Sequence, residues 1–114
     1  MTRLGRFAEL ARDEPYPGLE RRTFDASGAT VNEYRFEPGA RFPVHTHPQE
    51  QITLVEEGEV EMTIRDEVEV LAAGDWSVVA PDVPHGIRAG DTGARILAII
   101  VPRRSNATAY TVLE

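Results

Sequence analysis

The sequence predicts an all-β domain, a sandwich or barrel of short strands. Nine glycines and eight prolines recur at short intervals along the 114 residues, and the segments between them are rich in alternating or continuous apolar residues. The clearest alternation is in Glu59–Arg65, where every second residue is apolar and the others are charged or polar, which is typical of a half-buried strand. Helical spacing is confined to Arg6–Arg12, and Pro15 and Pro17 end that segment.

The first half of the chain contains three expected strands. Thr30–Glu37 alternates and ends at the turn signal Pro38-Gly39. Ile52–Val55 is a short apolar run that we expect to be closed by a turn at Glu57-Gly58. Glu59–Arg65 then begins the next hairpin.

The second half contains five expected strands. Val68–Leu71 follows a tight return, and Trp76–Ala80 is stopped by two prolines. Ile87–Ala89 is brief, whereas Ala94–Val101 is an almost unbroken apolar run, as expected for a strand buried on both sides or at a dimer contact. Thr108–Leu113 is the expected last edge strand.

We expect a single domain over residues 1–114, with the barrel at about residues 30–102 and an N-terminal arm over residues 1–29. The open edges of a small barrel, the arm and the apolar run Ile96–Val101 together predict a homodimer.

Composition excludes several classes of function. All 12 basic residues are arginine, so the lysine needed for Schiff-base chemistry is missing, and there is no cysteine. Against these stand 19 acidic residues, which give a net charge of −7 and argue against nucleic-acid binding. No apolar run has the length of a signal peptide or a membrane span. We therefore expect a cytoplasmic protein with no nucleic-acid or membrane partner.

Two of the three histidines, His45 and His47, stand two residues apart. Such residues in a strand project from the same face about 6.6–6.8 Å apart, so their imidazoles can close on one metal ion. Gln51 follows four residues after His47, and its amide oxygen can ligate a hard or borderline cation. The third histidine, His85, lies in a proline-rich turn. Taken alone, this spacing also fits an ordinary surface strand.

A more specific pattern is given by Gly39-x5-His45-x-His47-x3-Gln51-x6-Gly58 together with Gly74-x6-Pro81-x3-His85. These two stretches resemble the two motifs of the cupin superfamily. The resemblance implies a double-stranded β-helix, or jelly-roll, barrel in which both motifs converge on one metal ion in the barrel mouth. The ligands it implies are His45, His47, Gln51 and His85, and the cofactor is one divalent transition metal: Zn, Mn, Ni, Fe or Cu.

The fourth ligand position departs from the usual cupin pattern, which has Glu where this chain has Gln51. Glu50 is adjacent but points the other way in a regular strand, so Gln51 is the expected ligand and Glu50 the alternative. A site without a fourth ligand, or imidazoles that only pack the barrel mouth, are further alternatives. Three imidazoles and one amide, all neutral, leave the full +2 charge on the ion, which favours polarisation of substrate oxygens over oxygen activation.

Among small cupins, the resemblance is strongest to proteins related to the pectin-degradation enzyme that converts unsaturated uronates into linear keto forms, over HPQEQITLVEEGEVEMTI and GDWSVVAPDVPHG. The Asp-x-Phe-x3-Arg pattern of those enzymes falls on Ala98, Ile100 and Arg104, so only the arginine is retained. Arg104 is the implied clamp for a substrate carboxylate, with a solvated arginine as the alternative.

Tyr34 is a candidate cavity hydroxyl or a core residue, and Trp76 is expected to be a packing anchor rather than a substrate platform.

The expected function is a mononuclear metal-dependent enzyme. It would polarise a small oxygen-rich substrate, a sugar acid or another carboxylate, for isomerisation, ketonisation or lyase chemistry. No catalytic residue can be assigned, and Glu50 is the nearest candidate for a general base. The alternatives are a metal-dependent dioxygenase and a non-catalytic module that binds a small ligand.

Overall fold

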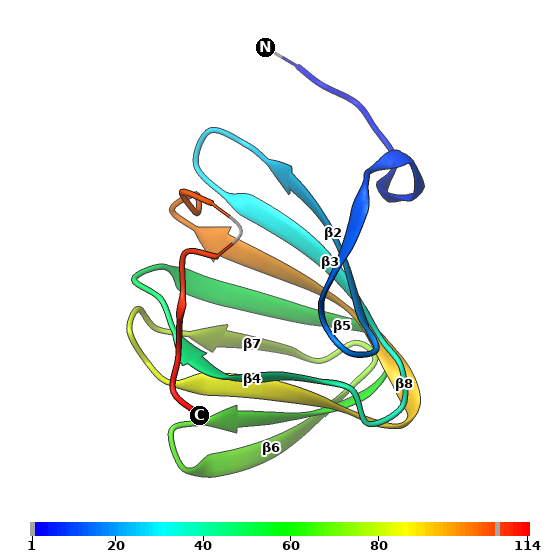
Figure 1. The fold of residues 1–114 in the computed structure, drawn as a ribbon, viewed down its shortest axis with the longest axis vertical. Coiled ribbons are helices and arrows are strands. Elements are labelled where there is room, and N and C mark those ends of the chain that lie inside the picture. Colours follow the sequence, from blue (N-terminus) through cyan, green and yellow to red (C-terminus); the bar gives the residue numbers. More distant parts are fainter. Residues whose placement is uncertain (1, 107) are drawn as a thin grey trace.

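The computed structural model of the protein describes residues 2–106 and 108–114. These residues form a curled, antiparallel, nine-stranded sheet (Figure 1). Its strands are β1 (Arg12–Tyr16), β2 (Leu19–Asp25), β3 (Thr30–Phe36), β4 (Arg41–Thr46), β5 (Glu50–Ile64), β6 (Glu67–Ala72), β7 (Trp76–Val79), β8 (His85–Val101) and β9 (Thr111–Val112). The described residues contain one helical element, the 3-10 turn η1 (Phe7–Glu9), and no helix in this part of the chain is long and apolar enough to cross a membrane. The predicted all-β class is confirmed.

The long strands β5 and β8 form the spine of the fold. They pair antiparallel along their length, from Glu50 opposite Val101 to Ile64 opposite His85. Each joins two strands that were expected to be separate. In β5, Gly58 is not at a chain reversal: the register shifts on either side of it while pairing with β8 continues. A positive-φ glycine lets a strand bend at such a bulge without leaving its partner.

The N-terminal region differs from the expectation. The helix expected over Arg6–Arg12 is wrong apart from the single turn η1, and residues 12–25, expected to belong to an arm, form β1 and β2 at one edge of the sheet. β2 lacks an apolar alternation because its buried positions are Leu19 and the charged Arg21. A hydrophobic pattern therefore does not mark it as a strand.

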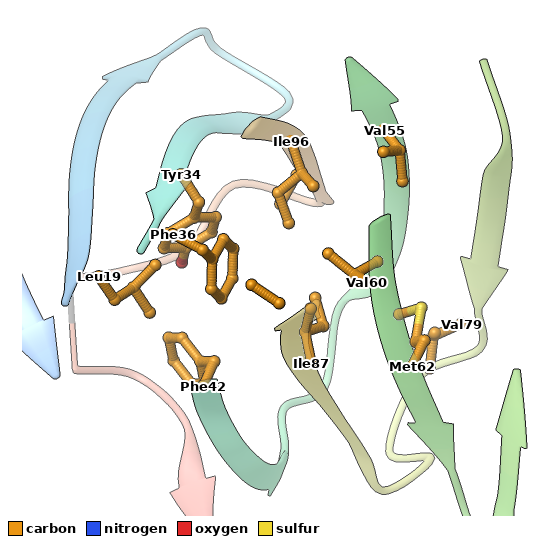
Figure 2. Close-up of a cluster of buried hydrophobic side chains, with 12 residues drawn as sticks. Leu19, Tyr34, Phe36, Phe42, Val55, Val60, Met62, Val79, Ile87 and Ile96 are labelled. Carbon is orange, nitrogen blue, oxygen red and sulfur yellow. The ribbon is translucent and has the colours of Figure 1, made fainter. Parts of the chain in front are cut away.

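The hydrophobic core lies inside the curl of the sheet, where side chains from facing strands point toward one another (Figure 2). Its members are Leu19, Tyr34, Phe36, Phe42, Val55, Val60, Met62, Val79, Ile87, Ala89, Ile96 and Ala98. The inner faces of β3 and β5 become polar toward one end: Asn32 and Thr53 lie in one cross-strand row with Ala98 between them. This end of the barrel carries the candidate site.

The C-terminal segment crosses the strand ends on one side of the sheet and holds β4 (Figure 1). The strand expected over Thr108–Leu113 is reduced to two residues, β9, which pair with β4. Glu114 extends this contact: its Oε2 accepts a hydrogen bond from the backbone N–H of Val44 at 2.7 Å and another from Arg41 Nη1 at 2.8 Å.

We expect Gly58→Ala to be much more destabilising than Gly39→Ala. Both glycines have φ near +75°, at +75° and +73°, so an alanine at either position costs about 1–2 kcal/mol for the left-handed conformation. A Cβ at Gly58 would also lie 2.1 Å from the carbonyl oxygen of Gly93, whereas one at Gly39 meets nothing within 4 Å. The added overpacking should cost roughly 1–3 kcal/mol more. Chemical denaturation of both variants measures the difference, and equal losses would refute the close approach of β5 and β8.

The contribution of Glu114 should depend on pH. Hydrogen bonds from Arg41 and Val44 lower the pKa of Glu114 from 4.5 to about 2. A carboxylate with a lowered pKa stabilises the fold fully above its unfolded pKa and loses this effect as the pH falls toward the folded value. The difference in Tm between the wild type and Glu114→Gln should therefore be constant above pH 5 and shrink between pH 4.5 and 2. A constant difference over the whole range would contradict this pairing.

Candidate metal centre

The three histidines reach one place from two separate segments. His45 lies on β4 directly opposite His85, the first residue of β8. His47 follows the end of β4. All three side chains are buried, with 1–3% exposure. The predicted convergence of both motifs therefore exists in the fold, and it is produced by the pairing of β4 with β8.

The imidazoles are close enough to share one ion. One ring nitrogen from each of His45, His47 and His85 lies within 4.8 Å of the others. The ring centroids of His45 and His85 are 4.3 Å apart, and those of His47 and His85 are 4.8 Å apart. Among the His, Cys, Asp and Glu side chains of residues 2–106 and 108–114, this is the cluster with the geometry to hold a metal ion.

Backbone carbonyls fix the orientation of all three rings. The Nδ1 atoms of His45, His47 and His85 lie 2.7, 3.0 and 2.8 Å from the carbonyl oxygens of Pro43, Gln49 and Val83 respectively. A carbonyl can only accept, so each Nδ1 carries the proton and donates it, and each Nε2 keeps a lone pair. This is the arrangement in which a neutral histidine serves as a metal ligand.

Gln51 places a further acceptor between two of these lone pairs. Its Oε1 lies 3.1 Å from His47 Nε2 and 3.2 Å from His85 Nε2. Its Nε2 donates to Thr53 Oγ1 at 3.1 Å, so the amide oxygen must face the histidines. Three acceptors without a proton between them repel one another, and a cation among them would remove that repulsion. The donor set therefore fits a metal ion.

Burial keeps the histidines neutral. Loss of solvation lowers the pKa of His45 to about 3 and that of His85 to about 4, and it lowers the pKa of His47 as well. The positive charge of Arg104 acts on all three in the same direction. At neutral pH the ligand atoms are thus free of protons that a metal would have to displace.

Arg104 is buried beside the cluster. It is 5% exposed, its backbone N–H donates to Thr30 Oγ1 at 2.9 Å, and its guanidinium carbon lies 5.6 Å from the ring centroid of Tyr110. The Tyr110 ring is in turn 5.3 Å from that of His45. The alternative of a solvated Arg104 is therefore wrong. The positive charge of Arg104 lies close enough to the three histidines to act on them.

Tyr34 belongs to the core and is also close to two arginines. Its ring packs edge-on against Phe42, 5.9 Å between centroids. Burial raises the pKa of the Tyr34 hydroxyl, while the charges of Arg104 and Arg21 act to lower it. Its hydroxyl is thus neutral and lies near Arg104, as a cavity hydroxyl would.

Two other residues lie away from the cluster. Glu50 precedes Gln51 on β5 and so points to the opposite face. Trp76 is 66% exposed and is paired with Leu54 on the outer side of the sheet, so it is neither a packing anchor nor part of the site.

Sequence reasoning missed three residues near the site. Gln49 orients His47 through its carbonyl and has a buried side-chain oxygen with no hydrogen-bond partner among the described residues. Tyr110 packs on His45, and Arg21 is 5% exposed on β2. None stands in a recognisable motif, and a charged residue in the run ERRTFD gives no signal that it faces inward.

Comparison with known proteins gives consistent matches. The family model described as Cupin domain matches residues 32–100. The chain is 35% identical over 78 residues to a protein named H2HPP isomerase from Bacillus subtilis, covering 68% of this chain and 33% of that protein, so it spans about one third of that relative.

Two solved structures are similar over most of their length. An RmlC-like cupin from Shewanella frigidimarina superimposes with a TM-score of 0.84 and 26% identity, covering 92% of this chain and 95% of that one. KdgF from Halomonas sp. superimposes with a TM-score of 0.80 and 25% identity, covering 90% and 97%. The predicted jelly-roll barrel is confirmed. Because the family match includes both histidine motifs and the strands that carry them, the chain belongs to the cupin domain family.

Proposed function

We propose that this cupin is a mononuclear metal-dependent enzyme that acts on a small oxygen-rich substrate, a sugar acid or another carboxylate, by isomerisation, ketonisation or lyase chemistry. The observation that carries the proposal is the group of unprotonated acceptors formed by Gln51 Oε1 with His47 and His85 Nε2. A buried group of acceptors of this kind is unfavourable by itself and is stabilised by a cation.

The metal would be held by His45, His47, Gln51 and His85, and it is a divalent transition ion: Zn, Mn, Ni, Fe or Cu. When bound, it supplies a Lewis acid that polarises a carbonyl or carboxylate oxygen. The chain contributes four neutral ligands, which leave the positive charge undiminished, and a dry site in which electrostatic effects are strong.

Substrate binding is assigned to Arg104 and Tyr34. The buried guanidinium of Arg104 suits a carboxylate, and the neutral hydroxyl of Tyr34 can donate a hydrogen bond to a substrate oxygen. The name of the Bacillus subtilis relative supports an isomerase, although this chain spans one third of that protein.

One observation keeps a non-catalytic binding module as the second candidate. Ala98 and Ile100 stand where the uronate-ketonising cupins that the sequence resembles have an acid and an aromatic residue, and both are buried with 0–1% exposure. These positions therefore offer no group that could move a proton. A module that only binds would return its ligand unchanged.

A homodimer is the proposed assembly. The outer face of the sheet carries a continuous cross-strand row of apolar residues, which are Phe24, Val31, Ile99, Ile52 and Val78, and a second row of Leu97, Leu54 and Trp76. Trp76 is 66% and Val78 49% exposed. Beside these rows, ion pairs join Glu33 to Arg35 and Glu57 to Arg95, so both signs of charge are present, as a self-complementary two-fold contact requires.

Protein purified without chelator or metal-affinity resin should contain about one transition metal ion per chain by elemental analysis. His47→Ala should lose the metal and the turnover of an unsaturated uronate prepared by lyase digestion of pectate, because it removes one of four ligands. Thr46→Val is the matched control: it lies between two ligands but supplies none, and it should keep both.

Three outcomes of this experiment separate the candidates. Undiminished turnover by metal-free protein would refute the metal-dependent enzyme. Uronate that binds but is recovered unchanged would support the binding module, and oxygen consumption by the Fe or Mn form would support a dioxygenase.

Light scattering at micromolar concentration should give the mass of two chains. Val78→Glu should produce a monomer because it places a charge in the apolar row. Val68→Glu, on β6 and similarly exposed at 58%, should leave the dimer unchanged. A monomeric wild type would refute this assembly.

A further inference from the structure

A recess opens at the polar end of the barrel, on the inner side of β2 and β3. It has a volume of about 330 Å³. The residues that the argument uses among its lining are Asp13, Arg21, Thr23, Asn32 and Arg104. Two of them, Arg21 and Asn32, belong to no motif in the sequence and to no role assigned above.

Three buried hydrogen-bond donors on side chains that line this recess have no partner. They are Arg21 Nη1, Asn32 Nδ2 and Arg104 Nε, and none of the described residues accepts from them. The three side chains are 5%, 1% and 5% exposed. A buried donor without a partner is unfavourable, so three on the side chains of one recess favour a compensating group. All three are N–H groups, and a ligand that satisfies them must present acceptors.

The remaining polar atoms of Arg21 and Asn32 are occupied, which fixes the free donors of these two side chains in place. Asp13 accepts from Arg21 Nε at 3.0 Å and from Arg21 Nη2 at 2.6 Å, a bidentate pair that leaves Nη1 free. Asn32 Oδ1 accepts from Thr23 Oγ1 at 2.6 Å, so its amide can only present Nδ2 to the recess. The donors are therefore positioned before a ligand arrives.

The charged groups that line the recess are ion-paired or hydrogen-bonded except for Arg104. Arg21 is neutralised by Asp13. Of the other charged groups in the lining, Asp25 accepts from Thr30 Oγ1 and Arg12 pairs with Glu20. Arg104 has no carboxylate partner among the described residues. A carboxylate can form an ion pair with Arg104, while the charge of Asp25 stays in the lining beside it. A phosphate dianion would bring a second negative charge against Asp13 and Asp25.

We propose that this recess binds the carboxylate group of a small organic acid through Arg21, Asn32 and Arg104. Arg21 and Asn32 would thus join Arg104 as residues that bind a carboxylate. Binding of a carboxylate in the recess does not depend on the metal. Only the role of the recess in orienting a substrate toward the histidines rests on the proposed function.

The position of the recess fits that orienting role. β3, β8 and β5 are neighbours, and Thr30, Ile100 and Gln51 form one cross-strand row, with Asn32, Ala98 and Thr53 in the next. Strand spacing places Asn32 and Thr53, the partner of Gln51, about 10 Å apart. Arg104 lines the recess, and its charge acts on the three histidines. An acid of a few carbon atoms held at one end would direct its other oxygens toward the cluster.

Titration of the full-length protein with acetate, followed by NMR of the side-chain N–H signals of Asn32 and Arg104, tests the inference. Saturable shifts are expected with acetate and not with acetamide, its neutral isostere. Asn32→Asp keeps the shape and the acceptor for Thr23 but replaces the donor by a charge, and it should weaken acetate binding at least tenfold. Arg104→Met, in the segment after β8, serves as a second variant should Asn32→Asp fail to fold, with the same expected loss.

Arg88→Ala is the matched control. Arg88 is exposed on β8 outside the recess, and its loss changes the net charge by one unit, as Asn32→Asp does, so acetate affinity should stay within twofold. His47→Ala should lose the metal and keep the acetate response, which separates this inference from the metal. A wild-type protein that binds acetate but contains no metal would contradict only the proposed function.

Three results would overturn the inference. They are equal shifts with acetamide, unchanged acetate affinity in the folded Asn32 or Arg104 variant, and binding of inorganic phosphate tenfold tighter than acetate. The last would identify a phosphate site instead of a carboxylate site.

Discussion

The constraint on which this site depends is the burial of four hydrogen-bond acceptors facing one another. Carbonyls turn the Nδ1–H of each histidine away, and Thr53 turns the amide nitrogen of Gln51 away, so the atoms that meet at the centre carry lone pairs only. Such a group is unfavourable without a cation. The pairing of β4 with β8, and of β8 with β5, maintains it by holding His45, His85 and Gln51 on rigid strands.

The charges around the cluster act together. The histidines are kept neutral by burial and by Arg104, so protons are excluded from the place where the proposed metal ion would be held. The same arginine adds positive charge on the side from which an organic acid would approach. Arg21 and Asn32 extend this side with two further fixed donors. The net charge of the chain is −7, yet this end of the barrel carries the donors that we propose bind an anion.

Much of the fold could be predicted from local patterns, and the two errors have different physical causes. Turn residues and alternation identified the segments in β3, β5, β6, β7 and β8, because period-two burial leaves a direct trace in the sequence. The bend at Gly58 was taken for a chain reversal, since a glycine at a bulge and a glycine in a turn meet the same conformational demand. β2 was missed because an inward arginine interrupts its apolar alternation.

The sequence by itself determined the all-β class, the family and the residues of the histidine cluster, since the spacing of His45, His47, Gln51 and His85 is a property of the chain. It also singled out Arg104 through the family pattern. Only the tertiary structure decided that Arg104 is buried, that Gln51 presents its oxygen, and that Arg21 and Asn32 join Arg104 in one recess. These three residues are separated by 11 and 72 positions, from 21 to 32 and from 32 to 104. Their proximity comes from β2 pairing with β3 and from the segment after β8 folding back over Thr30, and such long-range contacts have no local signature.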